Sequence, residues 1–422
     1  MRACRESLYA VLRAPTTVAL VEWAWGGHHP TYFTHFAAAL AEAGSIVVPF
    51  CPNPQDFSER LEALQLNDSV ARRIGKAECL PAPAKWTRLL PHIVRAKVHA
   101  LVFFGRIAAR LRAWDRRASA KIDLVFFTCV YDQTFREFPS VERLFGYSWA
   151  GLYLHVRSFR MPGSPVPYIG GLPCPEKIFT CKKLRAVAVL DEGAVAPLKK
   201  ITGGKPIVVF PDLTCNEMPS SDTSGWGLAD KAETLARGRP IVLLAGHLRW
   251  TKGLEDFTAL ALLPEMQDAF FLLAGDVSWA EVPEEKVKML QRAWEEAPNI
   301  YAHLQRLPEA TMNTLICRAS VVFAAYRSFP NSSNVLTKVA EFERPIVVSD
   351  GFLMAERVRE FGLGEIVAEG DVSGLSQALR LMAAPDYFGQ LKKRARWAEY
   401  RSMHSAERLP ASFNHILESL KG

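Results

Sequence analysis

The chain has 422 residues, of which 49% are hydrophobic and 23% are charged, and it contains no low-complexity tract. That composition excludes a disordered chain, and the length exceeds one ordinary hydrophobic core, so we expect two domains. The formal net charge is +7, and residues 83–123 alone hold ten Lys or Arg side chains against two acidic ones. The positive excess is therefore confined to one segment.

The cysteines and the apolar runs indicate the compartment of the protein. The eight cysteines are scattered, with no Cys-x-x-Cys pair and no histidines at metal-ligand spacing. This pattern predicts reduced thiols and disfavours zinc or a disulfide framework. Arg13 and Pro15 interrupt the N-terminal apolar run, and the apolar run HALVFFG in the basic segment is far shorter than a bilayer span. We therefore expect a cytoplasmic protein without a cleaved signal peptide.

Strand and helix patterns alternate along the N-terminal half. Apolar spacing predicts strand 17–25, helix 34–44, strand 45–50, helix 56–66, and then strands 122–130, 151–156, 184–191 and 206–212. Strands that alternate with helices are typical of a parallel, doubly wound sheet. We take residues 1–213 as this first, Rossmann-like domain.

A second domain follows a polar interruption. Residues 214–238 lose the apolar periodicity except for one short helix, so we interpret them as a linker. The later patterns predict strands 239–248, 269–276, 299–305, 319–326, 344–350 and 365–370, with helices that include 284–296 and 308–318. We assign residues 239–384 to a second Rossmann-like domain and 385–422 to a helical tail, broken at Pro410, that would cross back to the first domain. The expected fold class is α/β, with two doubly wound parallel sheets facing a cleft.

Four loops at expected carboxyl ends of strands carry residues suited to ligand binding. The first loop, WGGHHPTYF, begins with Gly26 and Gly27, whose backbone would let a ligand approach closely. His28 and His29 follow, and either can donate to an oxyanion or transfer a proton. The alternative is a tight turn with one packed and one solvated histidine.

The second and third loops belong to the second domain. In AGHLRWTKGLEDF, Arg249 and Lys252 follow Gly246, so two cations would share one phosphate cluster. In LLAGDV, Gly275 would let a base or ribose lie against the backbone, and Asp276 would accept from a hydroxyl. The alternatives are a solvated basic turn and ordinary turn chemistry, respectively.

The fourth loop, FPNSSNVLTK, leads into a helix between two expected strands. Ser332, Ser333 and Asn334 are residue types that cap helices, and the free N–H groups of a first helical turn favour an anion. The alternative is that the serines only cap their own helix. Because loops two to four follow strands of one parallel sheet, this helix start should lie opposite Arg249 and Lys252 of the second loop. The two cations and the helix start together favour a diphosphate as the ligand.

In this order and on two such domains, the loops resemble those of glycosyltransferases of GT-B fold, most closely the retaining family-4 type. That family has a G-R-L-x-x-x-K-G loop, whose arginine and lysine hold the donor diphosphate. The stretch GHLRWTKG matches it at Gly246, Leu248, Lys252 and Gly253. His247 stands at the arginine position, so Arg249 would have to substitute.

A later pattern of the family, E-G-F-x-N-V-L-x-E-A-M-A-x-G-x-P-V-V, contains two glutamates that bind the donor sugar and the ribose. The stretch NVLTKVAEFERPIVVSD aligns with it at Asn334, Val335, Leu336, Pro345 and Val347. Pro330 and Lys338 stand at the two glutamate positions, so neither carboxylate is retained. Glu341 would reach the ribose instead, and Lys338 would add affinity for negative charge.

The resemblance implies a hexosyltransferase that moves a sugar from a UDP- or GDP-linked donor to a glycan or lipid-linked acceptor. It also implies retention of configuration, with no metal and no cofactor besides the nucleotide sugar. Arg249, Lys252 and the helix start at residues 332–334 would stabilise the leaving diphosphate, and His28 would serve the acceptor. Two alternatives stay open: a non-catalytic nucleotide or glycan binder, and a nucleotide-sugar epimerase.

The basic segment, residues 83–121, has the pattern of an amphipathic helix. Its expected basic stripe is Arg106, Arg110 and Arg117, and its expected apolar stripe is Leu101, Phe104, Ala108 and Leu111. Such a helix is typical of peripheral contact with an anionic membrane, here the inner face of the plasma membrane. The alternative is an ordinary helix whose apolar side lies in the core. Nucleic acid is not an expected partner, because no nucleic-acid-binding motif accompanies the charge.

Overall fold

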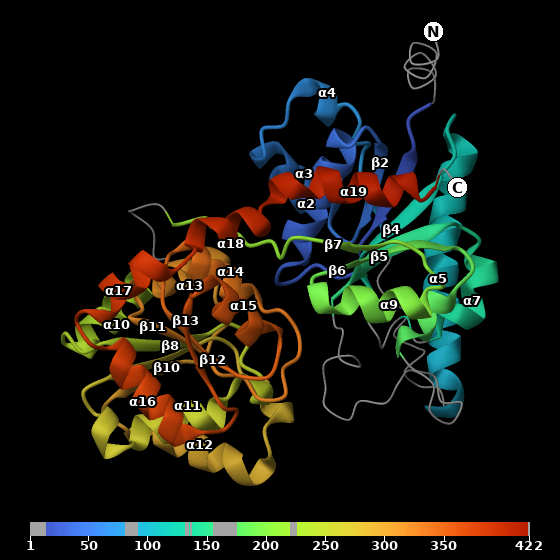
Figure 1. Ribbon diagram of the computed structural model, residues 1–422. Helices are drawn as coiled ribbons and strands as arrows, with labels where there is room; N and C mark the ends of the chain where they lie inside the picture. The colour runs from blue at the N-terminus through green and yellow to red at the C-terminus, as the bar shows by residue number, and fades with distance from the viewer. Residues whose placement is uncertain are drawn as a thin grey trace. The chain divides into compact units, whose positions relative to one another are not determined.

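The computed structural model describes residues 14–80, 92–130, 135, 137–154, 175–219 and 226–420 (Figure 1). The N-terminal apolar run, residues 83–91 of the basic segment, Cys4 and Cys174 lie outside the described residues. The chain divides into two compact units: unit 1 comprises residues 1–211 and 405–422, and unit 2 comprises residues 212–404. The helical C-terminal region is therefore shared between the two units.

Within the described residues, unit 1 contains a seven-stranded parallel sheet in the order β3-β2-β1-β4-β5-β6-β7. Its strands are β1 (Thr17–Val21), β2 (Ile46–Cys51), β3 (Glu78–Cys79), β4 (Leu124–Val130), β5 (Trp149–Tyr153), β6 (Leu184–Val189) and β7 (Ile207–Val209). Strands β1, β4 and β5 are buried along their whole length, as their continuous apolar runs predict. The strand order reverses at β1, which pairs with β2 on one side and β4 on the other.

Helices cover both faces of this sheet. They are α2 (His29–Glu42), α3 (Pro54–Ala63), α4 (Asp68–Ala71), α5 (His92–Arg117), α7 (Phe138–Phe145), α9 (Val195–Ile201) and α19 (Leu409–Glu418), with the 3-10 turns η2 (Pro175–Thr180), η3 (Glu192–Ala194) and η7 (Ala406–Arg408). Helix α19 packs on α2 (Figure 1), and the rings of Phe413 and Phe36 meet edge to face with 5.4 Å between centroids. Pro410 lies in the first turn of α19, where proline is tolerated, and the preceding helix α18 ends at Met403.

The basic helix α5 packs its apolar side against the sheet of unit 1. Its buried stripe is Ala100, Phe103, Phe104, Ile107, Ala108 and Leu111. Leu101, predicted to share this stripe, is 47% exposed because it lies one position away from Ala100. Arg106, Arg110 and Arg117 are exposed as predicted. Among the described residues, no helix is long and apolar enough to cross a membrane.

Unit 2 contains, among its described residues, a six-stranded parallel sheet in the order β10-β9-β8-β11-β12-β13. Its strands are β8 (Ile241–Ala245), β9 (Phe270–Ala274), β10 (Ile300–His303), β11 (Val321–Ala324), β12 (Ile346–Ser349) and β13 (Gly364–Val367). The strand order reverses at β8, which pairs with β9 and β11. Each strand lies within a predicted range except for the first residue of β13.

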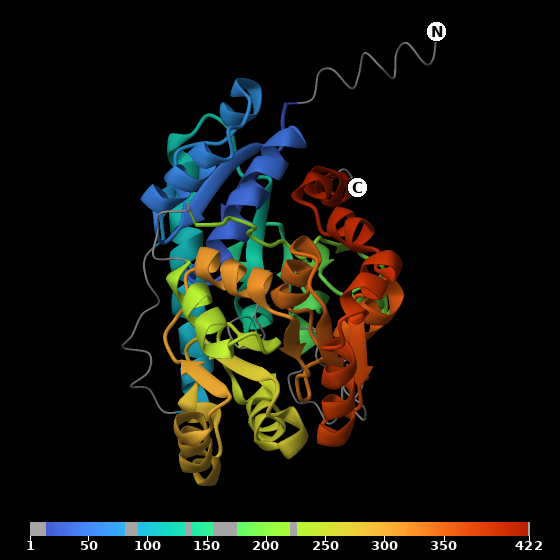
Figure 2. The same cartoon turned by 90° about the vertical axis from the view of Figure 1, so that its left-hand side faces the viewer.

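The helices of unit 2 form a layer on each face of its sheet (Figures 1 and 2). They are α10 (Gly227–Ala236), α11 (Leu254–Leu262), α12 (Glu284–Glu296), α13 (Glu309–Arg318), α14 (Asn334–Glu341), α15 (Leu353–Phe361), α16 (Val372–Met382), α17 (Tyr387–Arg394) and α18 (Trp397–Met403), with the 3-10 turns η4 (Trp250–Lys252), η5 (Pro264–Met266) and η6 (Trp279–Glu281). Helix α11 packs with α12 and α16, whereas α13 packs with α10 and α14.

The predicted α/β class with two doubly wound parallel sheets and C-terminal helices is confirmed. In unit 1, the bounds of α3 and β5 differ from the prediction by two or three residues, and two further differences have a local cause. Helix α2 begins at His29, five residues before the predicted start, because Pro30 suits a first helical turn. The two-residue edge strand β3 was not predicted, since two residues carry no periodic pattern.

Candidate functional site

Three of the four predicted loops meet at one edge of the unit 2 sheet. The loop after β8, the loop after β9 and the loop after β11 all leave the carboxyl ends of adjacent parallel strands. The strand order reverses between β8 and β11, and ligands of open α/β sheets bind at such a switch point. We therefore take this edge as the candidate site of unit 2.

Two glycines let the first two loops cross at close range. Gly246 and Gly275 both have positive φ, +102° and +143°. A Cβ on Gly275 would lie 1.8 Å from the carbonyl oxygen of Gly246, so no side chain fits there. The missing side chain of Gly275 thus accommodates neighbouring backbone, which is a different reason from the predicted approach of a base or ribose. Contact of either glycine with a donor remains a prediction.

Lys252 is a cation at this edge of the unit 2 sheet. It ends the 3-10 turn η4 and is half-buried, with its ammonium 5.4 Å from the centre of the Tyr326 ring. Burial and, secondarily, the charge of Arg249 lower the pKa of Lys252 to about 8, against the opposing effect of Asp276. No carboxylate of the described residues lies within ion-pair distance of its Nζ. A half-buried ammonium without a counterion is suited to bind an anion.

The neighbouring polar side chains are held by the chain's own acids. His247, at the family's arginine position, has Nδ1 2.7 Å from Asp276 Oδ2 and Nε2 2.8 Å from Ser278 Oγ. Arg249 donates through Nε to both carboxylate oxygens of Glu281, at 3.0 and 2.9 Å. Asp276 and Arg249, both predicted to contact the donor, are therefore engaged with other side chains. Exposed pairs of this kind contribute only about 0–1 kcal/mol, so a ligand can displace them.

The start of α14 is hydrogen-bonded to residues 212–217 of the same unit. Ser332 Oγ donates to the Asp212 carboxylate, and Arg357 donates to Ser332 Oγ at 2.9 Å. Thr214 donates to Asn334 Oδ1 at 3.1 Å. Ser333 is the N-cap residue of α14 and makes no side-chain cap bond. The fourth loop therefore faces its own chain at two of the three residues that were expected to face a ligand.

Lys338 is a buried cation. It is 1% exposed, and its Nζ donates to the Cys215 carbonyl oxygen at 2.9 Å and to Asn313 Oδ1 at 2.7 Å. Glu309 lies 2.8 Å from the same nitrogen. Further along α14, Glu341 accepts from Asn216 at 3.0 Å. Contact of Lys338 with a donor would require the release of residues 212–217.

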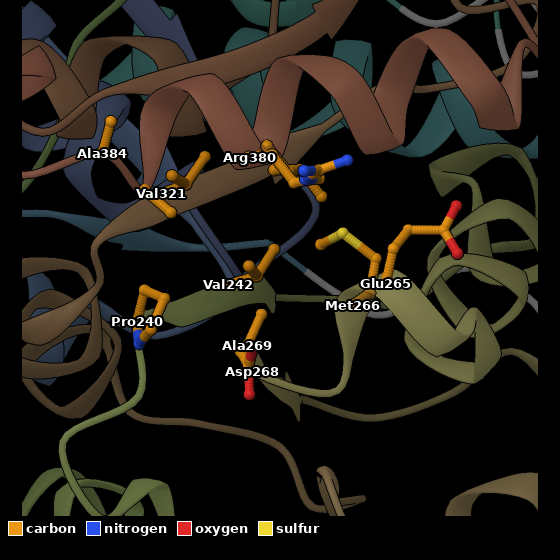
Figure 3. A pocket seen from close by; sticks show the side chains of 11 residues that line it. Pro240, Val242, Glu265, Met266, Asp268, Ala269, Val321, Arg380 and Ala384 are labelled. Carbon is orange, nitrogen blue, oxygen red and sulfur yellow. The ribbon is translucent and has the colours of Figure 1, made fainter.

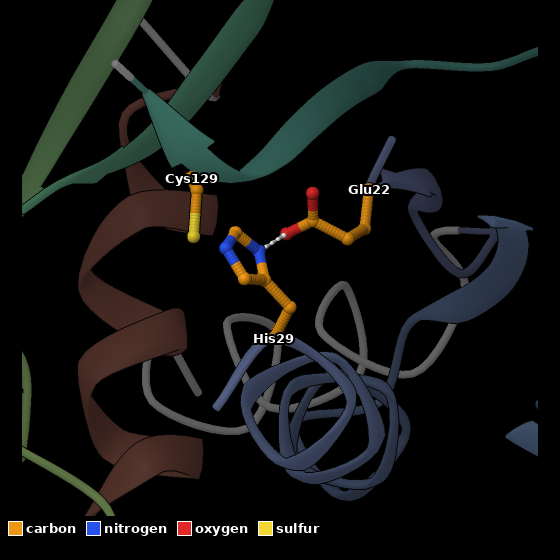
Figure 4. A group of neighbouring side chains, drawn as sticks. All are labelled: Glu22, His29 and Cys129. Atoms are coloured by element: carbon orange, nitrogen blue, oxygen red, sulfur yellow. Dashed lines mark hydrogen bonds and ion pairs between the residues drawn. The ribbon is translucent and has the colours of Figure 1, made fainter. Parts of the chain in front are cut away.

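In unit 1, the first loop places its two histidines at the start of α2. His28 is exposed and stacks on His29 with 5.3 Å between ring centroids. The buried carboxylate of Glu22 holds His29, with 2.9 Å between Oε2 and Nδ1 (Figure 4). Gly27 adopts φ +56° in open space before the helix, and the Gly26 carbonyl oxygen accepts from the His29 N–H. The histidine oriented by a carboxylate is therefore His29, whereas the sequence favoured His28.

A hollow of about 330 Å³ lies elsewhere in unit 2 (Figure 3). It is lined by Pro240, Val242, Ala269 and Val321, which lie at the amino ends of β8, β9 and β11, and by residues of α16 such as Arg380. Its lining is largely apolar and lies at the opposite edge from the loops. It is not the candidate site.

Comparison with known proteins identifies the architecture. No protein-family model and no curated protein matches the chain. Sucrose-phosphate synthase from Thermosynechococcus elongatus matches 96% of this chain and 99% of its own, with 15% identity and a TM-score of 0.65. A glycosyltransferase from Rickettsia africae matches 97% and 100%, with 12% identity and a TM-score of 0.65. HepE of Anabaena, in complex with UDP and glucose, matches 96% and 100%, with 11% identity and a TM-score of 0.63.

The chain has the GT-B fold. Its structural neighbours are GT-B glycosyltransferases, so the resemblance seen in the four loops agrees with the architecture as a whole. At these identities the likeness concerns the fold alone.

Sequence reasoning missed two contributors to the candidate site of unit 2. Tyr326, whose ring lies near the Lys252 ammonium, sits just beyond the end of β11. Glu281 holds Arg249 from the loop after β9. An aromatic residue at the carboxyl end of a strand was a usable signal for the first, but nothing in the spacing indicated the second.

A Lys338→Met substitution separates the two roles open to this residue in the GT-B chain. We expect it to lower the free energy of unfolding by about 2–4 kcal/mol, because the buried Asn313 side chain and the Cys215 carbonyl oxygen lose their charged donor. Urea unfolding measures this effect, and Lys231→Met, which removes an exposed lysine of the same unit, is the control. Unchanged stability together with weaker UDP binding would instead make Lys338 a donor ligand.

Proposed function

We propose that the protein is a glycosyltransferase that uses a nucleotide-sugar donor, UDP- or GDP-linked, bound at the carboxyl edge of the unit 2 sheet. The observation that carries the proposal is Lys252, a half-buried cation without a carboxylate partner at the switch point of a GT-B domain. The neighbours' complexes with UDP and UDP-glucose support a nucleotide sugar as the ligand class.

In this proposal the protein stabilises charge on the leaving group. As the glycosidic bond to the diphosphate breaks, negative charge grows on the β-phosphate, and Lys252 and the first-turn N–H groups of α14 offset it. Arg249 also stabilises the charge on the diphosphate once its ion pair with Glu281 is broken. We propose transfer with retention, without a metal or further cofactor, to a glycan or lipid-linked acceptor served by His28. Contact with the bound donor is proposed for the other predicted residues, which are Gly26, Gly27, Asp276, Ser332, Ser333, Asn334 and Glu341.

A second candidate is a GT-B protein that binds a nucleotide or glycan without transferring sugar. The observation that favours it is the engagement of Ser332, Asn334 and Lys338 by residues 212–217. In this case α14 would have exchanged sugar recognition for a structural contact.

One experiment separates these candidates. Purified protein is incubated with a panel of UDP- and GDP-sugars, with and without membrane extract, and release of nucleoside diphosphate is followed. Release that depends on extract supports the transferase. Donor binding without release would leave the non-catalytic binder, and conversion of the donor sugar without an acceptor would indicate an epimerase.

Binding of UDP should weaken as the pH rises through about 8. The free Lys252 has its pKa lowered to about 8, and a bound diphosphate raises this pKa because it favours the charged ammonium. Affinity is therefore full below about pH 8 and falls by up to about tenfold per pH unit above it, until the bound-state pKa is reached. Calorimetric titration from about pH 7 to 9.5 measures this, with Lys252→Met as the control that should show no such fall.

We further propose that α5 lets the protein associate with an anionic membrane surface, as a peripheral protein of the cytoplasmic side. Its exposed side chains include Arg95, Lys97 and Arg106, together with the apolar Val94 and Leu101. Cosedimentation with anionic but not neutral vesicles, lost in an Arg95→Glu/Lys97→Glu/Arg106→Glu variant, is the expected result. Equal recovery with both vesicle types would contradict it.

A further inference from the structure

Three metal-ligating side chains of different chemistry meet at the carboxyl edge of the unit 1 sheet (Figure 4). Glu22 directly follows β1, Cys129 is the last residue but one of β4, and His29 begins α2. Strands β1 and β4 are parallel neighbours at the point where the strand order reverses. The topology therefore brings together residues that lie 7 and 107 positions from Glu22 in the sequence.

The cluster is buried and held in place. Glu22 and Cys129 are 0% exposed, and the His29 side chain is 12% exposed. Glu22 Oε1 accepts from the backbone N–H groups of Trp23 and Ala24 at 2.8 and 2.9 Å, and Oε2 lies 2.9 Å from His29 Nδ1. In Figure 4 the imidazole lies between the carboxylate and the thiol. Backbone contacts therefore orient the carboxylate, and the carboxylate orients the ring.

We propose that Glu22, His29 and Cys129 form a binding site for a divalent transition metal, with Zn²⁺ as the ion that fits the three ligands best. One ligand atom from each residue lies within 4.8 Å of the other two. Ligands at about 2.0–2.3 Å from a tetrahedral zinc lie roughly 3.3–3.8 Å apart. The more distant pairs must therefore approach by up to about 1 Å, and Glu22 and His29, now 2.9 Å apart, exchange their hydrogen bond for contacts to the ion. Among the described residues, no other group of three such side chains meets the same condition.

The ligand chemistry selects the ion. Thiolate and imidazole suit zinc, and a carboxylate completes a common zinc ligand set, whereas Mg²⁺ and Ca²⁺ prefer oxygen ligands alone. The buried carboxylate and the thiolate together neutralise the two charges of the ion, which removes the cost of burying them unpaired. Binding releases the thiol proton of Cys129 to solvent, because the thiolate is the ligand. The described residues supply three of four tetrahedral positions, and water takes the fourth.

The three ligands of this site all belong to unit 1, and none of them is among the residues proposed to bind the donor or to serve the acceptor. The spacing rules that disfavoured zinc in the sequence look for ligands close together along the chain. Here each ligand comes from a different element, so those rules did not apply.

Metal analysis of the full-length protein tests the proposal. After incubation with Zn²⁺ and removal of unbound ion, we expect about one zinc per chain. The Co²⁺-loaded protein should show the near-ultraviolet thiolate-to-cobalt absorption. Cys129→Ser and His29→Asn should each lower zinc affinity at least tenfold, which corresponds to about 1.4 kcal/mol.

Cys181→Ser is the matched control, because Cys181 is also a buried thiol of unit 1 near a carboxylate, that of Glu142. It should keep the parent's zinc content and cobalt spectrum. Circular dichroism verifies that each variant is folded, and Glu22→Gln provides a nearly isosteric third variant. A folded parent without stoichiometric zinc, or a Cys129→Ser variant with the parent's zinc content, would overturn the proposal whatever the outcome of the nucleotide-sugar assays.

Discussion

A Lys252→Met variant is expected to bind UDP at least tenfold more weakly than the parent chain and, at the same time, to be more stable. The loss of a charge-assisted contact to phosphate costs about 1.5–3 kcal/mol, or roughly 10- to 150-fold in affinity. The gain in stability has the opposite origin. The fold lowers the pKa of Lys252 from 10.5 to about 8, so at neutral pH it holds an ammonium that is destabilised by burial. Replacing it by an apolar side chain of similar length should raise the free energy of unfolding by about 1–3 kcal/mol.

The sign of this effect follows from linkage. The folded protein binds the Lys252 proton less tightly than the unfolded chain does, so the destabilisation is fully present below about pH 8 and disappears as the pH rises toward the unfolded value of 10.5. Calorimetric titration with UDP measures the change in affinity, and urea unfolding at neutral pH measures the change in the free energy of unfolding. Lys231→Met should change neither. A Lys252→Met variant that lost both affinity and stability would mean that the ammonium serves the fold and that the loop is wrongly assigned.

A Gly275→Ala substitution is expected to be among the most damaging small changes in unit 2. The added Cβ would lie 1.8 Å from the Gly246 carbonyl oxygen and 2.8 Å from its carbon, and the φ of +143° is unsuited to alanine. Both atoms belong to backbone, so relief requires the exits of β8 and β9 to separate. We expect a loss of about 4 kcal/mol or more in the free energy of unfolding, measured by urea titration, or failure to accumulate as folded protein.

Two other glycines test this interpretation. Gly389 lies inside α17 with open space around it, so Gly389→Ala should be neutral or stabilise by about 0.5–1 kcal/mol. Gly246→Ala meets only the flexible Lys252 and Met312 side chains at 3.5 Å and beyond, so it should cost less than Gly275→Ala despite its φ of +102°. Equal tolerance at positions 275 and 389 would show that the two strand exits do not approach as closely as described.

Apolar periodicity was sufficient to predict the fold class. Both faces of a parallel sheet are buried, so its strands appear in the sequence as continuous apolar runs. It located β8 and β9 within their ranges and gave α12 its observed bounds. It failed where the signal is local geometry. The start of α2 depends on Pro30 in the first turn, and the exposure of Leu101 depends on a one-residue offset of the α5 stripe.

The candidate site was predictable as a set of loops but not as a set of contacts. Parallel strands bring Gly246, Lys252 and Gly275 to one edge, and the loop positions alone imply this. One partner of Lys338 and one partner of Ser332 are more than 100 residues earlier in the chain, at Cys215 and Asp212. The sequence of a loop does not show that a distant segment will form hydrogen bonds with the polar groups of that loop. For the same reason, the sequence did not predict that Cys129 lies beside His29.

The bond between Asp212 N–H and His404 Nδ1, 2.9 Å long, joins the first and the last residue of unit 2. Unit 2 is therefore one uninterrupted stretch of chain inserted into unit 1, with its two ends already neighbours. Insertions of this kind are the ones that tolerate excision and circular permutation. Residues 212 and 404 are therefore the natural ends of a separate polypeptide that contains the Lys252 loop and its surroundings. In a circularly permuted form, a short linker would join residue 404 to residue 212, and the new termini would lie at an exposed turn.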